Sequence, residues 1–160
     1  MTDDLLRSLV LQREGERLLH TYQRLVDARD VQGLADLVTD DVLLSRQGEE
    51  QRGREAFVDL YRRFAASDVD VAQHMATNVE VTELGTGGEG PVRIDSCFWV
   101  ITTHRSGEAR QVWGRYSDDM VRVDGRWLLS AKRIALVRTA FVEPSALAPA
   151  DMTSFGPRPD

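Results

Sequence analysis

The chain has 160 residues, a size typical of one domain. Its formal net charge of −6 argues against a general nucleic-acid binder, because such proteins need a basic surface that displaces counterions from phosphates. The sequence has no long apolar run and no basic signal segment, so we expect neither a membrane span nor a secretory leader. The single Cys97 cannot form an internal disulfide. We therefore expect a cytoplasmic protein.

The first part of the chain has a helical pattern. Between Asp3 and about Asp27, leucines and other apolar residues recur at helical spacing, which predicts one amphipathic helix. The stretch "DARDVQG" breaks it, and Asp30 is a suitable cap for a short helix from Val31 to Val38. A strand over residues 42–45, a polar loop "RQGEEQRG" and a third helix "REAFVDLYRRFAAS" complete this half of the chain.

The second half changes from a period of about 3.6 residues to a period of about 2, which predicts strands. The predicted strands cover residues 74–83, 92–103, 110–123 and 127–137. A glycine-rich turn "GTGGEGP" separates the first two, and Asp124-Gly125 between the last two is a strong hairpin signal. These elements predict a four-stranded antiparallel meander.

Helices followed by strands indicate an α+β fold. We predict N-terminal helices packed in a cone-shaped, strongly curved antiparallel sheet with an apolar interior, a cystatin-like α+β barrel. The final hairpin would form the closing wall of this cone. Residues 1–142 would make the single domain, and the proline-rich tail 143–160 would be partly disordered or wrapped on the surface.

Three stretches of the sequence resemble the nuclear transport factor 2-like superfamily, in its SnoaL-like and scytalone-dehydratase-like branch. They are "YQRLVDARDVQGLADLVTDDV", "RGREAFVDLYRRF" and "GRYSDDMVRVDGRWLLSAKRIAL", and with their surroundings they cover most of residues 10–138. This fold hosts enzymes, binding modules and structural subunits, so the function must be argued from the site.

The resemblance implies a catalytic set of Asp27, His74 and His104, because the dehydratases pair an aspartate at the first helix break with two strand histidines. An imidazole has an ordinary pKa near ~6.5, and a carboxylate on one ring nitrogen fixes its tautomer. The chain departs from the dehydratases at Val26, where they have a tyrosine, and its glycine-rich turn is longer than theirs, so the match of His104 depends on where that insertion is placed.

Structural interpretations compete with each of these assignments. Asp27 lies roughly opposite the apolar stripe on a helical wheel, which favours a solvated residue. His74 is equally consistent with a polar strand entry, and His104 with a solvated hairpin end, although His104 shares strand parity with Phe98 and Val100. A metal held by both histidines and Asp27 is an alternative, but the resemblance implies that no cofactor or metal is needed.

Five further residues are candidates for contact with a substrate. Tyr116 would donate a hydrogen bond to a substrate oxygen, and Asn78 shares strand parity with His74. The complete set that we predict is Tyr116, Asn78, Tyr22, Phe57 and Trp99. A half-buried strand tyrosine, an edge amide and ordinary core aromatic residues are the structural alternatives.

The function that we predict is a cofactor-independent acid–base enzyme, a dehydratase, isomerase or cyclase. Its substrate would be a small, mostly apolar carbonyl compound such as a polyketide or steroid-like metabolite. Two alternatives stay open: a non-catalytic subunit resembling the β subunit of ring-hydroxylating dioxygenases, and a small-ligand carrier. We expect a homodimer or homotrimer, because an exposed sheet face usually needs covering, and we expect no nucleic-acid or membrane partner.

Overall fold

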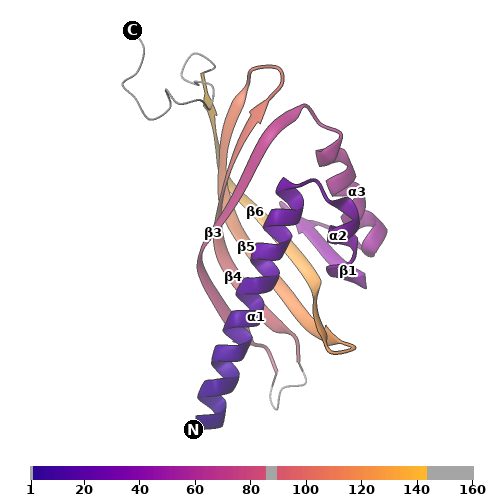
Figure 1. The fold of residues 1–160 in the computed structure, drawn as a ribbon, viewed down its shortest axis with the longest axis vertical. Helices are drawn as coiled ribbons and strands as arrows, with labels where there is room; N and C mark the ends of the chain where they lie inside the picture. Colours follow the sequence, from indigo (N-terminus) through magenta and orange to yellow (C-terminus); the bar gives the residue numbers. More distant parts are fainter. Residues whose placement is uncertain (1, 86–89, 144–160) are drawn as a thin grey trace.

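The computed structural model of the protein describes residues 2–85 and 90–143 (Figure 1). Three helices precede or interrupt the first strands, and four long strands follow. The helices are α1 (Thr2–Asp27), α2 (Val31–Ala35) and α3 (Arg54–Ala65), and the strands are β1 (Val38–Arg46), β2 (Glu49–Arg52), β3 (Val69–Glu83), β4 (Val92–His104), β5 (Ala109–Val123) and β6 (Arg126–Val142). The predicted glycine-rich turn lies partly, and the predicted proline-rich tail almost wholly, outside the described residues.

The described strands form one curved sheet that does not close, in the order β2-β1-β6-β5-β4-β3. The four-stranded meander is confirmed, because β3 to β6 pair with antiparallel neighbours in chain order. The sheet is nevertheless mixed, since β1 pairs in parallel with β6. The polar stretch predicted as a loop contains β2, which pairs with β1. The sequence indicates these two pairings weakly, because β2 has four residues that are all polar and the strand predicted in place of β1 covers only residues 42–45.

The β5–β6 hairpin bends at Asp124-Gly125, as its sequence predicts. The two residues have φ angles of 48° and 79°, the left-handed values that a tight hairpin turn requires. Residues 115–123 are extended, and β6 continues as far as Val142. The hairpin therefore supplies two central strands of the sheet, and its inward side chains form a wall of the interior.

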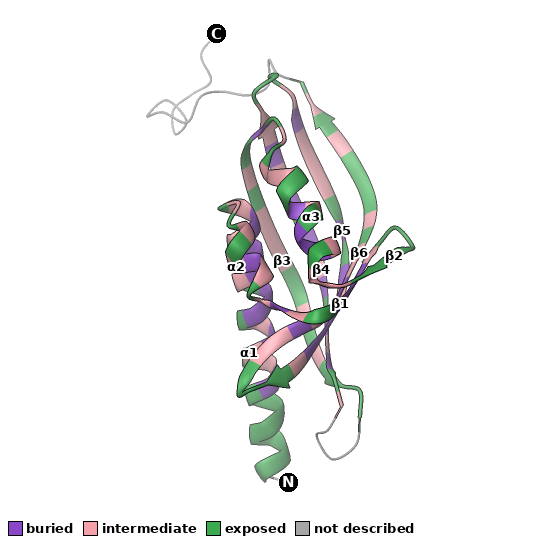
Figure 2. Cartoon of the chain, turned by 90° about the vertical axis from the view of Figure 1, so that its right-hand side faces the viewer, coloured by how far each residue is buried: buried purple, intermediate pink, exposed green. Residues whose placement is uncertain are grey.

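The helices lie over the concave face of the sheet, and the core fills the space between them (Figures 1 and 2). Alternation along β4 shows the two faces: Ile94 and Phe98 are buried under the helices, whereas Trp99 is 46% exposed on the convex side. The C-terminal half of α1 is buried through Leu18 and Leu19. The first residues of α1 are exposed and extend beyond the sheet.

Gly114 lies where the register of β5 against β6 shifts. A Cβ atom there would lie 2.1 Å from the carbonyl oxygen of Ala135 and 2.7 Å from the ring of Phe98. Such contacts are too close for any side chain, so glycine permits the tight approach of these strands. The Phe98 ring then stacks on Tyr116, with ring centroids 4.2 Å apart.

An ion pair is buried in the middle of the sheet. Lys132 Nζ lies 2.7 Å from Asp118 Oδ2, and the two side chains are 0% and 1% exposed. The ammonium also faces the rings of Tyr22 and Tyr116, at 4.0 and 3.4 Å from their centroids. Burial lowers the pKa of Lys132 and raises that of Asp118. Each charge is therefore paired inside the fold with the other, and the ammonium is also stabilised by two aromatic faces.

Candidate active site

A cavity of about 480 Å³ opens between the concave face of the sheet and the helices α1 and α3. Most of its wall is apolar, as expected for a small-molecule site. The apolar wall consists of Val26, Leu60, Phe64, Val69, Phe98, Val100, Val112, Ile134 and Leu136. The polar side chains of the wall include two imidazoles, each paired with a carboxylate, and a group of tyrosines.

The first pair joins the end of α1 to β3. His74 Nδ1 lies 2.5 Å from Asp27 Oδ1, and the backbone N–H of His74 donates to Asp27 Oδ2 at 3.0 Å. Since an ionised carboxylate can only accept, Nδ1 carries the proton and Nε2 is left as the acceptor. His74 is part of the cavity lining and only 11% exposed. The pair thus fixes the orientation of the imidazole, and in its neutral form Nε2 is a candidate base.

Asp27 reaches His74 because it is the last residue of α1. A helical wheel predicts a solvated side chain there, but the side chain is 24% exposed and bonds twice to His74. The chain turns sharply after it, with Arg29 at a φ of 56°. The wheel describes only the core-facing stripe of the helix, whereas Asp27 contacts the neighbouring strand β3.

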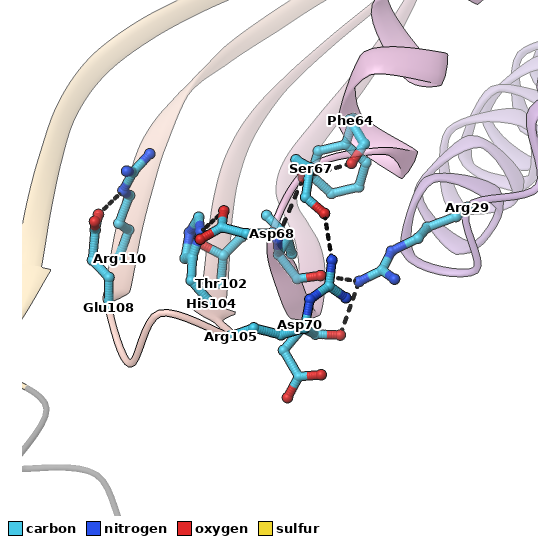
Figure 3. Close-up of polar contacts among 11 residues, drawn as sticks. Arg29, Phe64, Ser67, Asp68, Asp70, Thr102, His104, Arg105, Glu108 and Arg110 are labelled. Atoms are coloured by element: carbon cyan, nitrogen blue, oxygen red, sulfur yellow. Dashed lines mark hydrogen bonds and ion pairs between the residues drawn. The ribbon is translucent and has the colours of Figure 1, made fainter.

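The second pair lies where the β4–β5 hairpin begins (Figure 3). His104 Nδ1 is 2.8 Å from Asp68 Oδ1, and His104 Nε2 is 3.2 Å from the Thr102 hydroxyl oxygen. The imidazole is 7% exposed, whereas the Asp68 carboxylate is 54% exposed. The hydrogen bond to His104 holds the pKa of Asp68 below its ordinary value. Both His104 and Asp68 are in the cavity lining.

Three tyrosines, Tyr22, Tyr61 and Tyr116, are part of the cavity lining. The hydroxyls of Tyr22 and Tyr61 are 2.8 Å apart, and Tyr116 packs edge-on against Tyr22. All three side chains are at most 5% exposed, and burial raises their pKa values. They therefore stay protonated near neutral pH. Because one hydrogen bond between Tyr22 and Tyr61 uses one O–H, the other O–H can donate to a substrate oxygen.

Three of the predicted substrate contacts lie elsewhere. Asn78 is exposed at a bulge of β3, where a φ of 54° ends the alternation that would have placed it beside His74. Phe57 is 0% exposed and packs in the core against Tyr61. Trp99 faces the convex side, opposite Trp113. The cavity lining includes none of these three residues, so their assignment as substrate contacts is corrected.

Other residues of the site were not predicted. Asp68 has no motif of its own, and its contact with His104 follows only from the register in which β3 faces β4. Tyr61 has the spacing of an ordinary core residue on α3. Lys132 is the single lysine of an arginine-rich chain, but its position beneath the tyrosines depends on the irregular pairing of β5 with β6.

The alternative in which one metal binds both histidines and Asp27 is not matched by the geometry. Asp27 bonds to His74, and His104 bonds to Asp68. Within residues 2–85 and 90–143 no three His, Cys, Asp or Glu side chains gather as a metal site would require. In the same part of the chain no helix has the length and apolarity needed to cross a bilayer.

Comparison with known proteins gives a family and a fold. A family model described as a SnoaL-like domain matches residues 8–133. No curated protein matches the sequence. Solved structures match over nearly the whole chain, at identities that show the fold alone.

Three of these structures illustrate the likeness. A "Putative Scytalone Dehydratase" from Novosphingobium aromaticivorans has 22% identity and a TM-score of 0.75, covering 88% of this chain and 91% of its own. A hexachlorocyclohexane dehydrochlorinase (LinA, type 2) has 19% identity and a TM-score of 0.75, covering 95% and 100%. A "putative aromatic ring hydroxylase" from the same Novosphingobium has 19% identity and a TM-score of 0.74, covering 84% and 94%.

Proposed function

From the premise that this chain belongs to the SnoaL-like domain family, we propose that it is a cofactor-independent acid–base enzyme of the lyase or isomerase type. The observation that supports this most is the Asp27–His74 pair, whose imidazole lines a largely apolar cavity. Two of the similar structures bear the names of a dehydratase and a dehydrochlorinase, which both denote eliminations. The substrate that we propose is a small, mostly apolar carbonyl compound.

The first step would be removal of a proton. His74 Nε2 takes the proton from a carbon beside the substrate carbonyl, and Asp27 stabilises the imidazolium that forms. The electron pair of the broken C–H bond moves toward the carbonyl oxygen. A hydroxyl of the tyrosine group donates a hydrogen bond to that oxygen as its negative charge grows. The mostly apolar wall excludes water and so strengthens both interactions.

The second step decides between the reaction types. In a dehydration, the electron pair returns to form a C=C bond while the β-hydroxyl leaves with a proton as water. His104 is the candidate acid for this proton, because its ring is in the lining and its imidazolium form is stabilised by Asp68. In an isomerisation, the proton returns to a different carbon instead. The same two imidazoles serve both reactions.

Proton exchange tests the proposal before the natural substrate is known. Small cyclic and aromatic β-hydroxy ketones are incubated with the protein in D2O, and NMR follows deuterium entering beside the carbonyl. We expect the wild-type protein to accelerate exchange, and His74→Ala to slow it by about 10²–10⁴-fold. The circular dichroism spectrum should be unchanged. Equal acceleration by His74→Ala and wild type would refute the role of His74.

An exposed tryptophan pair favours a second candidate, a non-catalytic subunit in a larger assembly. Trp99 and Trp113 face each other across β4 and β5 on the convex side and are 46% and 39% exposed. Exposed aromatic residues of this kind are typical of interfaces. A second copy of this chain would cover the same face in an enzyme dimer or trimer. Sedimentation of the wild type and of Trp113→Glu distinguishes these two proposals. If the wild type self-associates and the variant does not, the result favours a homo-oligomeric enzyme. If the wild type is a monomer, the result favours a subunit that needs a different partner.

A further inference from the structure

The charged side chains in the mostly apolar cavity lining are chiefly positive, although the protein carries a net charge of −6. Among the described residues of the lining are three arginines, Arg46, Arg63 and Arg110, and a single carboxylate, Asp68. Arg110 pairs with Glu108 beside the second histidine (Figure 3). Arg46 and Arg63 also belong to the lining of a second hollow, and the proposed chemistry does not use them.

Arg46 and Arg63 mark the passage from the cavity to a second hollow. Arg46 is the last residue of β1, and Arg63 lies in the last turn of α3. Both line a neighbouring hollow of about 350 Å³ as well as the main cavity, and so do Leu60 and Leu136. A molecule that extends from one space into the other would therefore contact residues of this shared border, which includes both arginines.

The positive charge at this passage is not fully neutralised by the protein. Arg63 pairs with Asp59, one turn earlier on α3, but Asp59 lines neither space. For Arg46, the residues that the structure describes provide no ion pair. Its cross-strand neighbour Glu49 makes none with it, although Glu49 also lines the second hollow. The charge of Arg46 is felt inside the cavity, where it opposes the rise in the pKa of Tyr61 that burial causes.

We propose that the substrate carries an anionic group, a carboxylate or a phosphate, which binds between Arg46 and Arg63. Guanidinium groups suit such oxygens because their planar N–H donors match two acceptors at once. This assignment rests on the proposed function, because it assumes that the apolar part of the substrate extends inward to His74. The remainder of the substrate would project into the second hollow. The substrate class is thus an apolar carbonyl compound with an anionic tail.

Binding of matched probes tests this inference without knowledge of the natural substrate. Naphthoate, naphthyl phosphate and the uncharged naphthamide share an apolar ring system and differ in charge. By isothermal titration calorimetry we expect the preferred anion to bind roughly tenfold more tightly than the amide, and the difference to shrink as salt is added. The tighter of the two anions identifies the group. Equal affinities for all three probes would overturn the proposal.

Variants assign the preference to the two arginines. Arg46→Gln and Arg63→Gln should each lower the affinity for the anion by roughly tenfold while leaving that for naphthamide unchanged. Arg62→Gln is the matched control, because Arg62 is the adjacent residue on α3, pairs with Glu55 and lines neither space. If the three variants behave alike, the anion does not bind between Arg46 and Arg63.

The same titrations in a His74→Ala background separate this inference from the catalytic proposal. The anion preference should persist there, because it depends on Arg46 and Arg63 and not on proton transfer. Exchange activity without an anion preference would contradict the anionic substrate alone. An anion preference without exchange activity would contradict the catalytic proposal and leave the anion site in place.

Discussion

The two carboxylate–imidazole pairs of the cavity contain the same chemical groups in different surroundings. Asp27 uses both oxygens on His74, and both side chains are at most 24% exposed. Asp68 holds His104 from a carboxylate that is 54% exposed, and the far nitrogen of His104 already contacts Thr102. Water and salt screen the second pair more strongly than the first. The first pair therefore has the less exposed carboxylate, and its imidazole is the one to which we assign the role of base.

This difference follows from where the chain places each carboxylate. Asp27 ends a helix that packs against the sheet, so its side chain is enclosed by α1 and β3. Asp68 lies in the short connection between α3 and β3, next to the β4–β5 turn, where the backbone N–H of Arg105 donates to its carbonyl oxygen. A loop position gives the imidazole a fixed direction but leaves the carboxylate in contact with solvent. Orientation and burial are therefore separable properties in this site.

The largest effect should come from breaking the first pair. In Asp27→Asn the amide oxygen can still accept from the His74 backbone, but the amide no longer fixes the Nδ1–H tautomer. We expect the exchange rate to fall by about 10²–10⁴-fold, with the fold retained. Asp70→Asn is the matched control, because Asp70 is exposed and lies outside the cavity lining. A variant with wild-type exchange would show that the pair does not act in catalysis.

The Lys132–Asp118 pair is a third charged pair, and both of its side chains are fully buried, unlike those of the two carboxylate–imidazole pairs. Lys132→Met leaves the Asp118 carboxylate without its cation, and the free energy of unfolding should fall by about 3–5 kcal/mol. The double variant Lys132→Met/Asp118→Leu removes both charges and should recover much of this loss. Urea denaturation measures both. A single variant as stable as wild type would mean that the carboxylate is protonated or reached by water.

Breaking the second pair should have a smaller effect on exchange. In Asp68→Asn, His104 loses a screened partner but keeps its contact with Thr102. We expect a decrease of less than about tenfold, and a smaller decrease at high salt. The measurement is the exchange assay at two ionic strengths. A loss as large as that of Asp27→Asn, unaffected by salt, would make the two pairs equivalent.

The smallest expected effect is on stability at acid pH. The pKa of Asp68 lies below its ordinary value of 3.8 in the folded protein, chiefly because of the hydrogen bond with His104. As the pH falls, the unfolded state therefore binds the proton at a higher pH than the folded state does. The stabilisation by the ionised carboxylate is complete above pH 3.8, and it is lost as the pH falls through the lower pKa of the folded state. The stability difference between wild type and Asp68→Asn should disappear over this range in denaturation experiments. A difference that persists below it would assign the effect to something other than this charge.

The sequence was informative about elements with a strong local pattern. The period of α1, the alternation in β4 and β5 and the Asp124-Gly125 turn are local features, and each predicted element is present. The parallel contact of β1 with β6 could not be predicted in this way, because it joins strands far apart in the chain. β2 was missed because its residues are all polar and exposed.

The site was predictable only in part, for the same physical reason. Asp27, His74 and His104 were selected through a family resemblance and their side-chain chemistry, and the structure brings Asp27 and His74 together. The partner of His104 depends on strand register, which no local pattern gives. Asn78 was misplaced because one bulge residue reverses the alternation along β3. Errors of this kind come from long-range pairing and not from residue chemistry.

The burial of Lys132 gives this protein an unusual chemical property. It is the only lysine among the 160 residues, and its side chain is 0% exposed. Acylating reagents that modify surface amines should therefore leave Lys132 unmodified in the native protein. Modification of Lys132 would require the sheet to open, and mass spectrometry of the labelled chain would then report directly how often the core becomes accessible.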